Sequence, residues 1–375
     1  MYKGFKFRMY PTNDQEKIIN TNLDNKRFIY NHYLDKAKTS NQINTKQNIF
    51  DYSQILKPTS TSLQTLDIKI AYTTLYSLEN NFKKLNNLEI MKFKSKYNKN
   101  SYTISSNKSI NNPNIILDLK RKTITLPYLE NIKIRGYKKL KEIKGRIINV
   151  TISKEPTGKY YVSVLYELTN VNPIKNPKNI VGIDIGIKQL LTLSDGTTYE
   201  NIHIQEKYRK RIKRKQRELS RKIKGSKNYY KCKKELAILY SKLKNIRKSY
   251  IHKITKSITD EYDIITCENL KTKEMIIQGK TNNLSTKIND ATFTEILRQL
   301  SYKAKIKGKK FYQVDTYYPS SQICSRCDNQ DKKYKDLNER EYKCVKCGQA
   351  LDRDFNSSIN IMFEGLKLYI KSYAK

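Results

Sequence analysis

The sequence predicts a multidomain α/β protein, and three observations support this prediction. With 375 residues and 37% hydrophobic content, the chain is long enough to form two or three domains with cores of their own. Apolar residues recur with a period of two between about 100 and 170, whereas after residue 179 short apolar runs alternate with helical patterns. A stretch at 171–179 that contains two prolines separates these regions, and we expect it to be a linker.

The part before the linker is expected to be a helical region inserted into an antiparallel β unit. Lysines alternate with aromatic or apolar residues in YKGFKFRMY, which predicts a first strand within residues 1–12. Residues 13–98 carry a helical periodicity. Residues 99–170 contain short strand patterns joined by Gly, Pro and Asn turns, and we expect the first strand to join them.

The part after the linker has the element order β-β-β-α-β-α-β-α, which is typical of an RNase H-like mixed sheet with helices on both faces. Residues 180–319 and 351–375 are assigned to this domain. Within it, residues 203–258 are predicted to form a basic helical hairpin. A segment with four cysteines, residues 320–350, interrupts the domain before its last helix.

The net charge of +40 and the pI near 9.8 predict a polyanionic partner, and nucleic acid is the usual one. An AT-rich genome would favour lysine over arginine, but codon bias does not easily produce so large an excess over acids. No apolar run reaches the length of a membrane span, and the opening MYKGFKFRMYP lacks the apolar stretch of a secretory signal. We therefore expect a cytoplasmic, prokaryotic protein that is nucleoid-associated when bound to DNA.

Four of the six cysteines have the spacing of metal ligands. Two Cys-x2-Cys pairs, separated by sixteen residues, are formed by Cys324, Cys327, Cys344 and Cys347. Such pairs are typical of tetrahedral zinc, and four thiolates leave no open coordination position. We therefore predict a structural zinc site, with chance spacing of reduced cysteines as the plainer alternative.

Three acidic residues are candidates for a second metal site. Asp184 and Glu268 each end an apolar strand, and Asp354 begins a helix that is expected to pack beside them. Carboxylate oxygens that converge in this way suit Mg²⁺ or Mn²⁺. Each acid alone has an ordinary alternative, which for Asp354 is a helix cap. Asp352 is interpreted as lying outside the helix, in a supporting or solvent-exposed position.

The stretch 207–256 contains 21 Lys and Arg residues against two acids, Glu218 and Glu235. Its apolar residues recur at steps of three and four, which predicts one packed face and one basic face. A charge run is usually only a solvated surface, but at this density we favour contact with phosphates. The residues expected to make that contact are Lys213, Arg214, Arg217 and Arg221. In the N-terminal helical region, Tyr72 and Tyr76 are candidates either for base stacking or for the core.

Several segments together carry a family resemblance: FKFRMYPT, GIDIGIK, ITCENLK, and YPSSQICSRC followed by YKCVKCGQALDRDFNSSINI. They resemble the TnpB family, which consists of RNA-guided DNA endonucleases encoded by insertion sequences and similar to type V CRISPR effectors. The resemblance covers essentially the whole chain, and its motifs are most specific in the last 200 residues. Two positions depart from the family pattern: Asp328 replaces a usual glycine, and Ser357 and Ser358 replace common alanines.

The resemblance implies a RuvC-like nuclease domain with an inserted zinc knuckle, and a wedge-type β domain with a helical recognition region. Asp184, Glu268 and Asp354 would be the catalytic acids and would hold two Mg²⁺ ions, with Asp184 as the bridging ligand. The implied partners are a guide RNA from the element's own transcript and double-stranded target DNA, cut next to a short flanking motif.

Two other functions remain open. One is a nuclease-inactive, guide-dependent DNA-binding regulator, against which the presence of all three acids argues. The other is an RNA-independent transposase or resolvase. The histidines His32, His203 and His252 form neither a His-x-His pair nor an HNH site. There is also no Walker A motif, so the sequence gives no case for the use of a nucleotide triphosphate.

Overall fold

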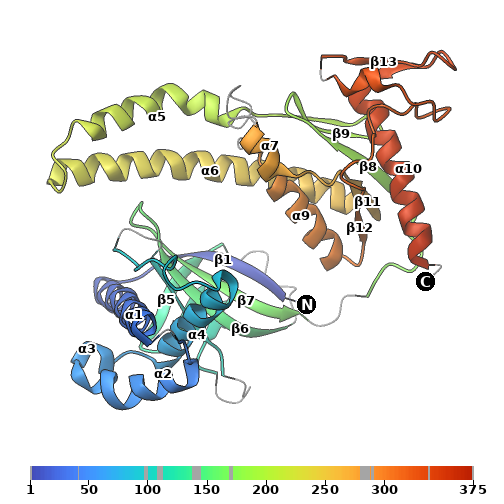
Figure 1. Cartoon of the computed structure of the whole chain (residues 1–375). Coiled ribbons are helices and arrows are strands. Elements are labelled where there is room, and N and C mark those ends of the chain that lie inside the picture. Colours follow the sequence, from blue (N-terminus) through green and yellow to red (C-terminus); the bar gives the residue numbers. More distant parts are fainter. Residues whose placement is uncertain are drawn as a thin grey trace. The chain divides into compact units, whose positions relative to one another are not determined.

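The computed structural model describes residues 2–40, 42–96, 100–107, 113–136, 145–168, 172–278, 288, 291–336 and 338–373. The chain divides into two compact units, Met1–Asn170 and Val171–Lys375. The division falls at the start of the stretch for which the sequence predicts a linker. Each unit is considered by itself below, and Figure 1 labels their helices and strands.

The first unit contains an antiparallel sheet in which the first strand of the chain is central. In the described residues the strand order is β2-β6-β7-β1-β5-β4-β3. Strand β1 pairs with β7 over most of its length and with β5 at its end, so the expectation that the first strand joins the later ones is confirmed. The bounds are β1 Tyr2–Tyr10, β2 Asn100–Ser105, β3 Ile116–Asp118, β4 Thr123–Leu126, β5 Leu129–Arg135, β6 Gly145–Lys154 and β7 Tyr160–Leu168.

The helices of this unit lie between β1 and β2 in the chain and pack against the sheet. They are α1 Asn13–Ser40, α2 Thr45–Asp51, a π turn Tyr52–Leu56, a 3-10 turn Lys57–Thr59, α3 Thr61–Gln64 and α4 Ile68–Leu85. Helices α1 and α4 pack on each other and on β2. The helical region ends earlier than residue 98, because Asn86 adopts a left-handed conformation (φ 48°) that caps α4. The rings of Tyr72 and Tyr76 are about half exposed (50% and 53%), so the core alternative for them is wrong.

The second unit contains a mixed sheet with the order β10-β9-β8-β11-β12 in its described part. Strands β8, β11 and β12 are parallel, whereas β9 and β10 extend the sheet antiparallel from β8. The bounds are β8 Ile180–Ile185, β9 Gln189–Leu193, β10 Thr198–Glu200, β11 Ile264–Cys267 and β12 Lys310–Gln313. The parallel pairing brings the C-terminal ends of β8 and β11 to the same edge.

Helices cover both faces of this sheet, as the element order predicts. They are α5 Ile204–Ser220, α6 Lys227–Glu261, α7 Thr272–Gln278, α9 Phe293–Ile306 and α10 Arg353–Tyr373. Because side chains alternate along a strand, Ile183 and Ile265 enter a core with α6 and α9, and Gly182 faces α10 instead. No helix in the described ranges combines the length and the apolar character that crossing a membrane requires.

Helix α10 lies in near-backbone contact with the sheet. A Cβ atom built on Gly182 of β8 would lie 2.1 Å from the carbonyl oxygen of Ser358, and one built on Gly365 would lie 1.8 Å from Oγ1 of Thr266. These two glycines therefore allow α10 to approach β8 and β11 closely, which fixes the position of its N-terminal turn.

Candidate functional site

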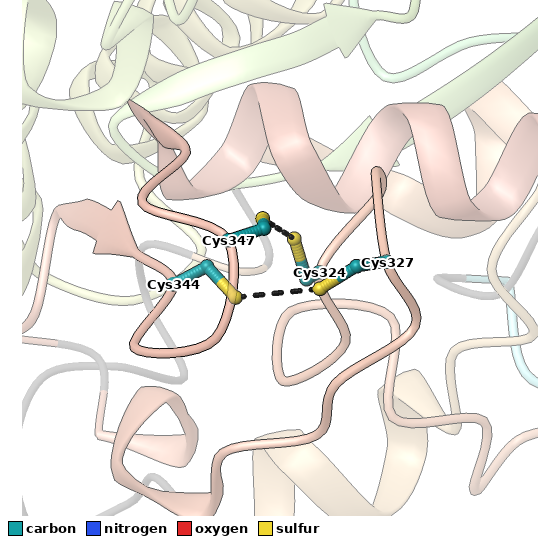
Figure 2. Close-up of side chains that lie close together, drawn as sticks. All are labelled: Cys324, Cys327, Cys344 and Cys347. Carbon is teal, nitrogen blue, oxygen red and sulfur yellow. Dashed lines mark hydrogen bonds between the residues drawn. The ribbon is translucent and has the colours of Figure 1, made fainter.

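The four cysteines with metal-ligand spacing lie together in two loops before α10 (Figure 2). Cys324 and Cys327 belong to the first loop, and the second loop joins β13 (Glu341–Lys343) to β14 (Ala350–Asp352). Both loops turn back through a left-handed residue, Asp328 (φ 57°) in the first and Gly348 (φ 69°) in the second. Asp328, which stands where the related sequences usually have glycine, therefore preserves the turn, because aspartate is among the few non-glycine residues that adopt this conformation.

The distances between the sulfur atoms fit a metal and exclude disulfides. Sγ of Cys324 lies 3.6 Å from that of Cys347, and Sγ of Cys327 lies 3.5 Å from that of Cys344. All four ligand atoms lie within 4.8 Å of one another. A disulfide would need about 2.05 Å, whereas zinc–sulfur bonds of about 2.3 Å in a tetrahedron place sulfurs about 3.8 Å apart. The cluster can therefore bind a metal such as zinc.

The backbone around the second loop favours a thiolate. Hydrogen bonds from the backbone N–H groups of Cys347 and Lys346 lower the pKa of Cys344 to about 6. Since the thiolate is the form that binds metal, this side chain is ready to act as a ligand near neutral pH. The rings of Tyr334 and Tyr342 pack against each other at an angle of 36°, with centroids 4.2 Å apart, and form a small core with the cysteines.

The three acids that the sequence singles out lie at one edge of the second unit's sheet. Asp184 is the second-last residue of β8, Glu268 directly follows β11, and Asp354 is in the first turn of α10. Burial, followed by the charges of Glu268 and Asp354, raises the pKa of Asp184 well above its usual value. Burial also raises the pKa of Glu268, and the charge of Asp354 adds to this effect. Three partly buried carboxylates that repel one another suit a divalent cation.

The three carboxylates are more widely spread than the four sulfurs. Among the described residues, the cysteine cluster is the one group of three or more His, Cys, Asp or Glu whose ligand atoms all lie within 4.8 Å. A wider spread is compatible with two cations, because the metal ions of two-metal sites lie about 3.5–4 Å apart. Their role as metal ligands remains a prediction.

Two serine hydroxyls connect Asp184 with Glu268. Ser357 Oγ lies 3.1 Å from Oδ1 of Asp184 and 2.9 Å from Oγ of Ser320. Ser320 Oγ in turn donates to Oε1 of Glu268 at 2.7 Å. Both serines are buried, and Ser320 comes from the turn that leads into the cysteine loops.

Asp354 is paired with arginines and is not the cap of its helix. Oδ1 of Asp352 accepts the backbone N–H groups of Asp354 and Phe355 at 2.9 and 3.0 Å, so Asp352 is the N-cap. The alternative reading of Asp354 as a cap is therefore wrong. Its carboxylate accepts from Nη2 of Arg353 at 3.0 Å and from Nη1 of Arg340 at 3.4 Å. It also lines a cavity of about 370 Å³, from which a ligand can reach it.

The basic stretch forms a pair of packed helices, α5 and α6, that Figure 1 shows side by side. Their contact is apolar and centres on Ile204, Ile212, Leu239 and Leu243. On the outside, a hollow of about 770 Å³ is lined by Lys210, Lys213, Arg214, Arg217, Glu218, Arg221 and Lys222. All four residues expected to contact nucleic acid thus line one concave, exposed surface. By contrast, Lys215 pairs with Glu218 and Glu235 at 2.8 and 2.7 Å.

Sequence reasoning did not identify the polar residues that connect the acids with the cysteine loops. Besides the two serines, Asn356 Nδ2 donates to the carbonyl oxygen of Ile323 at 2.7 Å, and Asn360 Nδ2 donates to that of Ser320 at 2.8 Å. The available signal is the polar cluster NSSIN in the first two turns of α10.

Family profiles match three parts of the chain. Residues 163–278 match OrfB_IS605, described as "Probable transposase". Residues 293–361 match "Cas12f1-like, TNB domain", which includes all four clustered cysteines and Asp354. Residues 1–44 match the "Helix-turn-helix domain" of OrfB_IS605, and here this segment forms β1 and α1.

Two curated relatives extend these matches. A "Putative RNA-guided DNA endonuclease" from Streptomyces pristinaespiralis is 26% identical over 97% of this chain and 89% of its own length. The "Putative RNA-guided DNA endonuclease InsQ" from Escherichia coli K12 is 32% identical over 66% of this chain and 63% of its own length. The chain is thus similar to TnpB-family proteins over nearly its whole length, including the TnpB-like protein L79 of Acanthamoeba polyphaga mimivirus, which is 24% identical over 98% of this chain and 74% of its own length. The resemblance seen in the sequence motifs is thereby confirmed.

This chain is also similar to a solved structure, "Cryo-EM structure of the Cas12f1-sgRNA-target DNA complex". The TM-score is 0.55 with 15% sequence identity, over 96% of this chain and 98% of that one. At this identity the likeness concerns the fold, and it shows that the two proteins share an α/β multidomain architecture. The predicted fold class is confirmed to that extent.

Proposed function

We propose that this chain is an RNA-guided, metal-dependent DNA endonuclease encoded by a transposable element. The observation that carries this proposal is the convergence of Asp184, Glu268 and Asp354 at one sheet edge, in a chain whose relatives are named RNA-guided DNA endonucleases. Guide RNA and double-stranded target DNA are the proposed partners, and the net charge of +40 supports both. Since that substrate is genomic DNA, the protein would act in the cytoplasm of a prokaryotic cell.

The three acids are proposed to hold two Mg²⁺ ions. Bound Mg²⁺ would activate the attacking water and neutralise the charge that develops on the leaving 3′ oxygen. Asp184 is proposed as the bridging ligand, because after burial the charges of both Glu268 and Asp354 raise its pKa, so Asp184 interacts with each of the other two acids. The positive charges of Arg340 and Arg353 balance the negative charge of Asp354, and a bound cation would take over part of this role.

The finer fold assignment belongs to the same proposal. The second unit, with its mixed sheet and α10, would be a RuvC-like nuclease domain, and the four-cysteine segment would be a knuckle that holds a structural zinc. The sheet of the first unit would be a wedge domain and its helices a recognition region. Exposed Tyr72 and Tyr76, whose rings are parallel within 5°, support base stacking by α4.

Cleavage of a guide-matched plasmid tests the proposed activity. Asp184→Ala is expected to lose cleavage but keep nucleic-acid binding, because one carboxylate is removed and the basic surface remains. Glu364→Gln is a matched control on α10, since Glu364 lies ten residues beyond Asp354 and pairs with Lys367. Cleavage by Asp184→Ala at the wild-type rate would remove Asp184 from the active site.

Sequencing of RNA that is purified together with the protein tests guide dependence. We expect to recover mainly one RNA, which is transcribed next to the gene and whose sequence varies at one end. Recovery of DNA alone, combined with cleavage that needs no RNA, would favour an RNA-independent transposase or resolvase. If the protein bound DNA in a guide-dependent way but did not cleave it in Mg²⁺ or Mn²⁺, the result would favour a nuclease-inactive DNA-binding regulator.

A further inference from the structure

Asp184 and Glu268 are joined by an unbroken row of four oxygen atoms. The row runs from Oδ1 of Asp184 through the hydroxyls of Ser357 and Ser320 to Oε1 of Glu268, with separations of 3.1, 2.9 and 2.7 Å. These four residues come from β8, α10, the turn before the cysteine loops and the end of β11. The row is therefore a tertiary feature that no single element could produce.

Each hydroxyl of the row can donate to one carboxylate. Ser320 donates to Glu268, and Ser357 has one proton, which it can donate either to Asp184 or to Ser320. A serine side chain has one heavy-atom torsion, and so it holds its hydrogen bond with little entropic cost. Donation to a carboxylate also stabilises the ionised form, in which the acid binds a cation.

The backbone fixes both serines. Ser357 is the fifth residue of α10, and the close contact of that helix with Gly182 leaves it little freedom to shift. The carbonyl oxygen of Ser320 accepts from Nδ2 of Asn360 at 2.8 Å, one turn further along α10. Ser357 is 1% exposed and Ser320 is 4% exposed, so water does not compete for either hydroxyl.

We propose that Ser320 and Ser357 are positioning residues that hold the carboxylates of Glu268 and Asp184 for a divalent cation. The two serine contacts use Oε1 of Glu268 and Oδ1 of Asp184, and these two carboxylates would hold the cation. The proposal depends on the proposed function in one respect only, namely that these acids bind divalent metal. Because Ser320 directly precedes the cysteine loops, the bridge also ties Glu268 to the four-cysteine knuckle.

The neighbouring Ser358 provides a matched control. It is fully buried like Ser357, but its hydroxyl donates to the carbonyl oxygen of Phe355 in its own helix at 2.7 Å. A change of either serine to alanine removes one buried hydroxyl from α10 and has the same effect on helix propensity. Only the change at Ser357 removes a hydrogen bond from an acid.

Mn²⁺ binding to the full-length, zinc-loaded protein tests the proposal, measured by electron paramagnetic resonance of free Mn²⁺ without nucleic acid. Ser357→Ala and Ser320→Ala are each expected to weaken binding about tenfold, the effect of one charge-assisted hydrogen bond. Ser358→Ala is expected to bind as the wild type does. Zinc content and melting temperature without Mn²⁺ are measured for each variant to exclude misfolding.

The dependence of cleavage on Mg²⁺ concentration gives a second readout. The half-saturating Mg²⁺ concentration should rise about tenfold in Ser357→Ala, while the rate at saturating Mg²⁺ recovers, because the ligands themselves are present. Wild-type Mn²⁺ affinity in both bridge variants would overturn the proposal and leave the proposed function intact. Unchanged Mn²⁺ binding in Asp184→Ala would instead show that the acids are not a metal site.

Discussion

At the scale of single residues, two of the acids at the edge of the second unit's sheet, Asp184 and Glu268, are in surroundings that disfavour their charged forms. Asp184 and Glu268 are partly buried, and for both residues burial is the largest cause of a raised pKa. Burial of a charge costs free energy unless a partner compensates it. The serine hydroxyls compensate part of that cost, and a divalent cation would compensate more.

These raised pKa values predict an unusual dependence of stability on pH. A carboxyl group whose folded-state pKa lies above its unfolded value contributes stability below the unfolded pKa, about 4. That contribution is lost as the pH rises through the folded pKa. Without divalent metal, the free energy of unfolding should therefore fall as the pH rises above about 4, in urea titrations. In Asp184→Asn this fall should be smaller, and Mg²⁺ should stabilise the wild type more at pH 8 than at pH 5. If the free energy of unfolding depended on pH equally in the wild type and in Asp184→Asn, this prediction would be contradicted.

The two left-handed turns of the knuckle give a second residue-scale prediction. Asp328→Gly should raise the stability of the zinc-loaded protein by roughly 0.5–1 kcal/mol, because glycine adopts this conformation without steric cost. Gly348→Asp should lower it by a similar amount, since a Cβ there meets nothing within 4 Å and only the backbone conformation is affected. Melting temperatures that shift in the same direction for both variants would contradict this account.

At the scale of elements, α10 is the helix that assembles the candidate active site. It carries Asp354, Ser357 and Asn356, and it packs on β8, β9, β11 and β12. Asn356 and Asn360 connect it with the first cysteine loop. One helix thus determines the positions of the acids and of the knuckle together.

The close packing of α10 makes Gly182 a sensitive position. Gly182→Ala should destabilise the protein by about 3 kcal/mol, because its Cβ would lie 2.1 Å from backbone oxygen and the helix would have to move. Gly4→Ala in β1 is the control, since a Cβ there meets nothing within 4 Å. Thermal unfolding measures both effects. A Gly182→Ala protein as stable as Gly4→Ala would show that α10 packs less closely than described.

The knuckle predicts a dependence on zinc. Cys344→Ser should release the metal and destabilise the C-terminal part of the chain, because structural zinc contributes folding energy directly. Cys232→Ser is the control, since Cys232 is also buried but lies on α6 outside the cluster. Elemental analysis and limited proteolysis measure the two outcomes. Native protein without zinc would contradict the assignment.

At the scale of the whole molecule, the excess of basic charge is the property with the widest effect. The four basic residues along the hollow of α5 lie on an exposed, polar face, so they can be neutralised without opening the apolar contact with α6. Changing Lys213, Arg214, Arg217 and Arg221 to glutamine should weaken DNA binding about uniformly across sequences. The slope of log K against log salt should flatten by roughly 0.9 for each lost phosphate contact.

Two results decide this prediction about the hairpin. The melting temperature of the quadruple variant should equal that of the wild type, because no buried contact is lost. A variant that keeps the wild-type salt slope would show that this surface is only solvated.

The fold and the candidate site could be predicted from the sequence where local patterns carry the information. The alternation in residues 2–10 and the steps of three and four in α6 are local, and so is the spacing of the cysteines. The serine bridge could not be predicted in this way, because it depends on how α10 is rotated relative to β8 and on the turn at Ser320. The left-handed Asn86 that ends α4 could not be predicted in this way either, because an apolar pattern does not give the backbone conformation of one residue.

The central position of β1 has a consequence for the order in which the protein is made. Strand β1 leaves the ribosome first, but its main partner β7 begins at residue 160. At about 5–20 residues per second, β1 waits roughly 10–30 s before that partner is synthesised. Until β5 and β7 are made, the edges of β1 lack the partners that they have in the fold, and an unpaired strand rich in aromatic residues can pair with other chains. The lysines and the arginine that alternate along β1 give nascent chains a shared positive charge, which opposes such pairing.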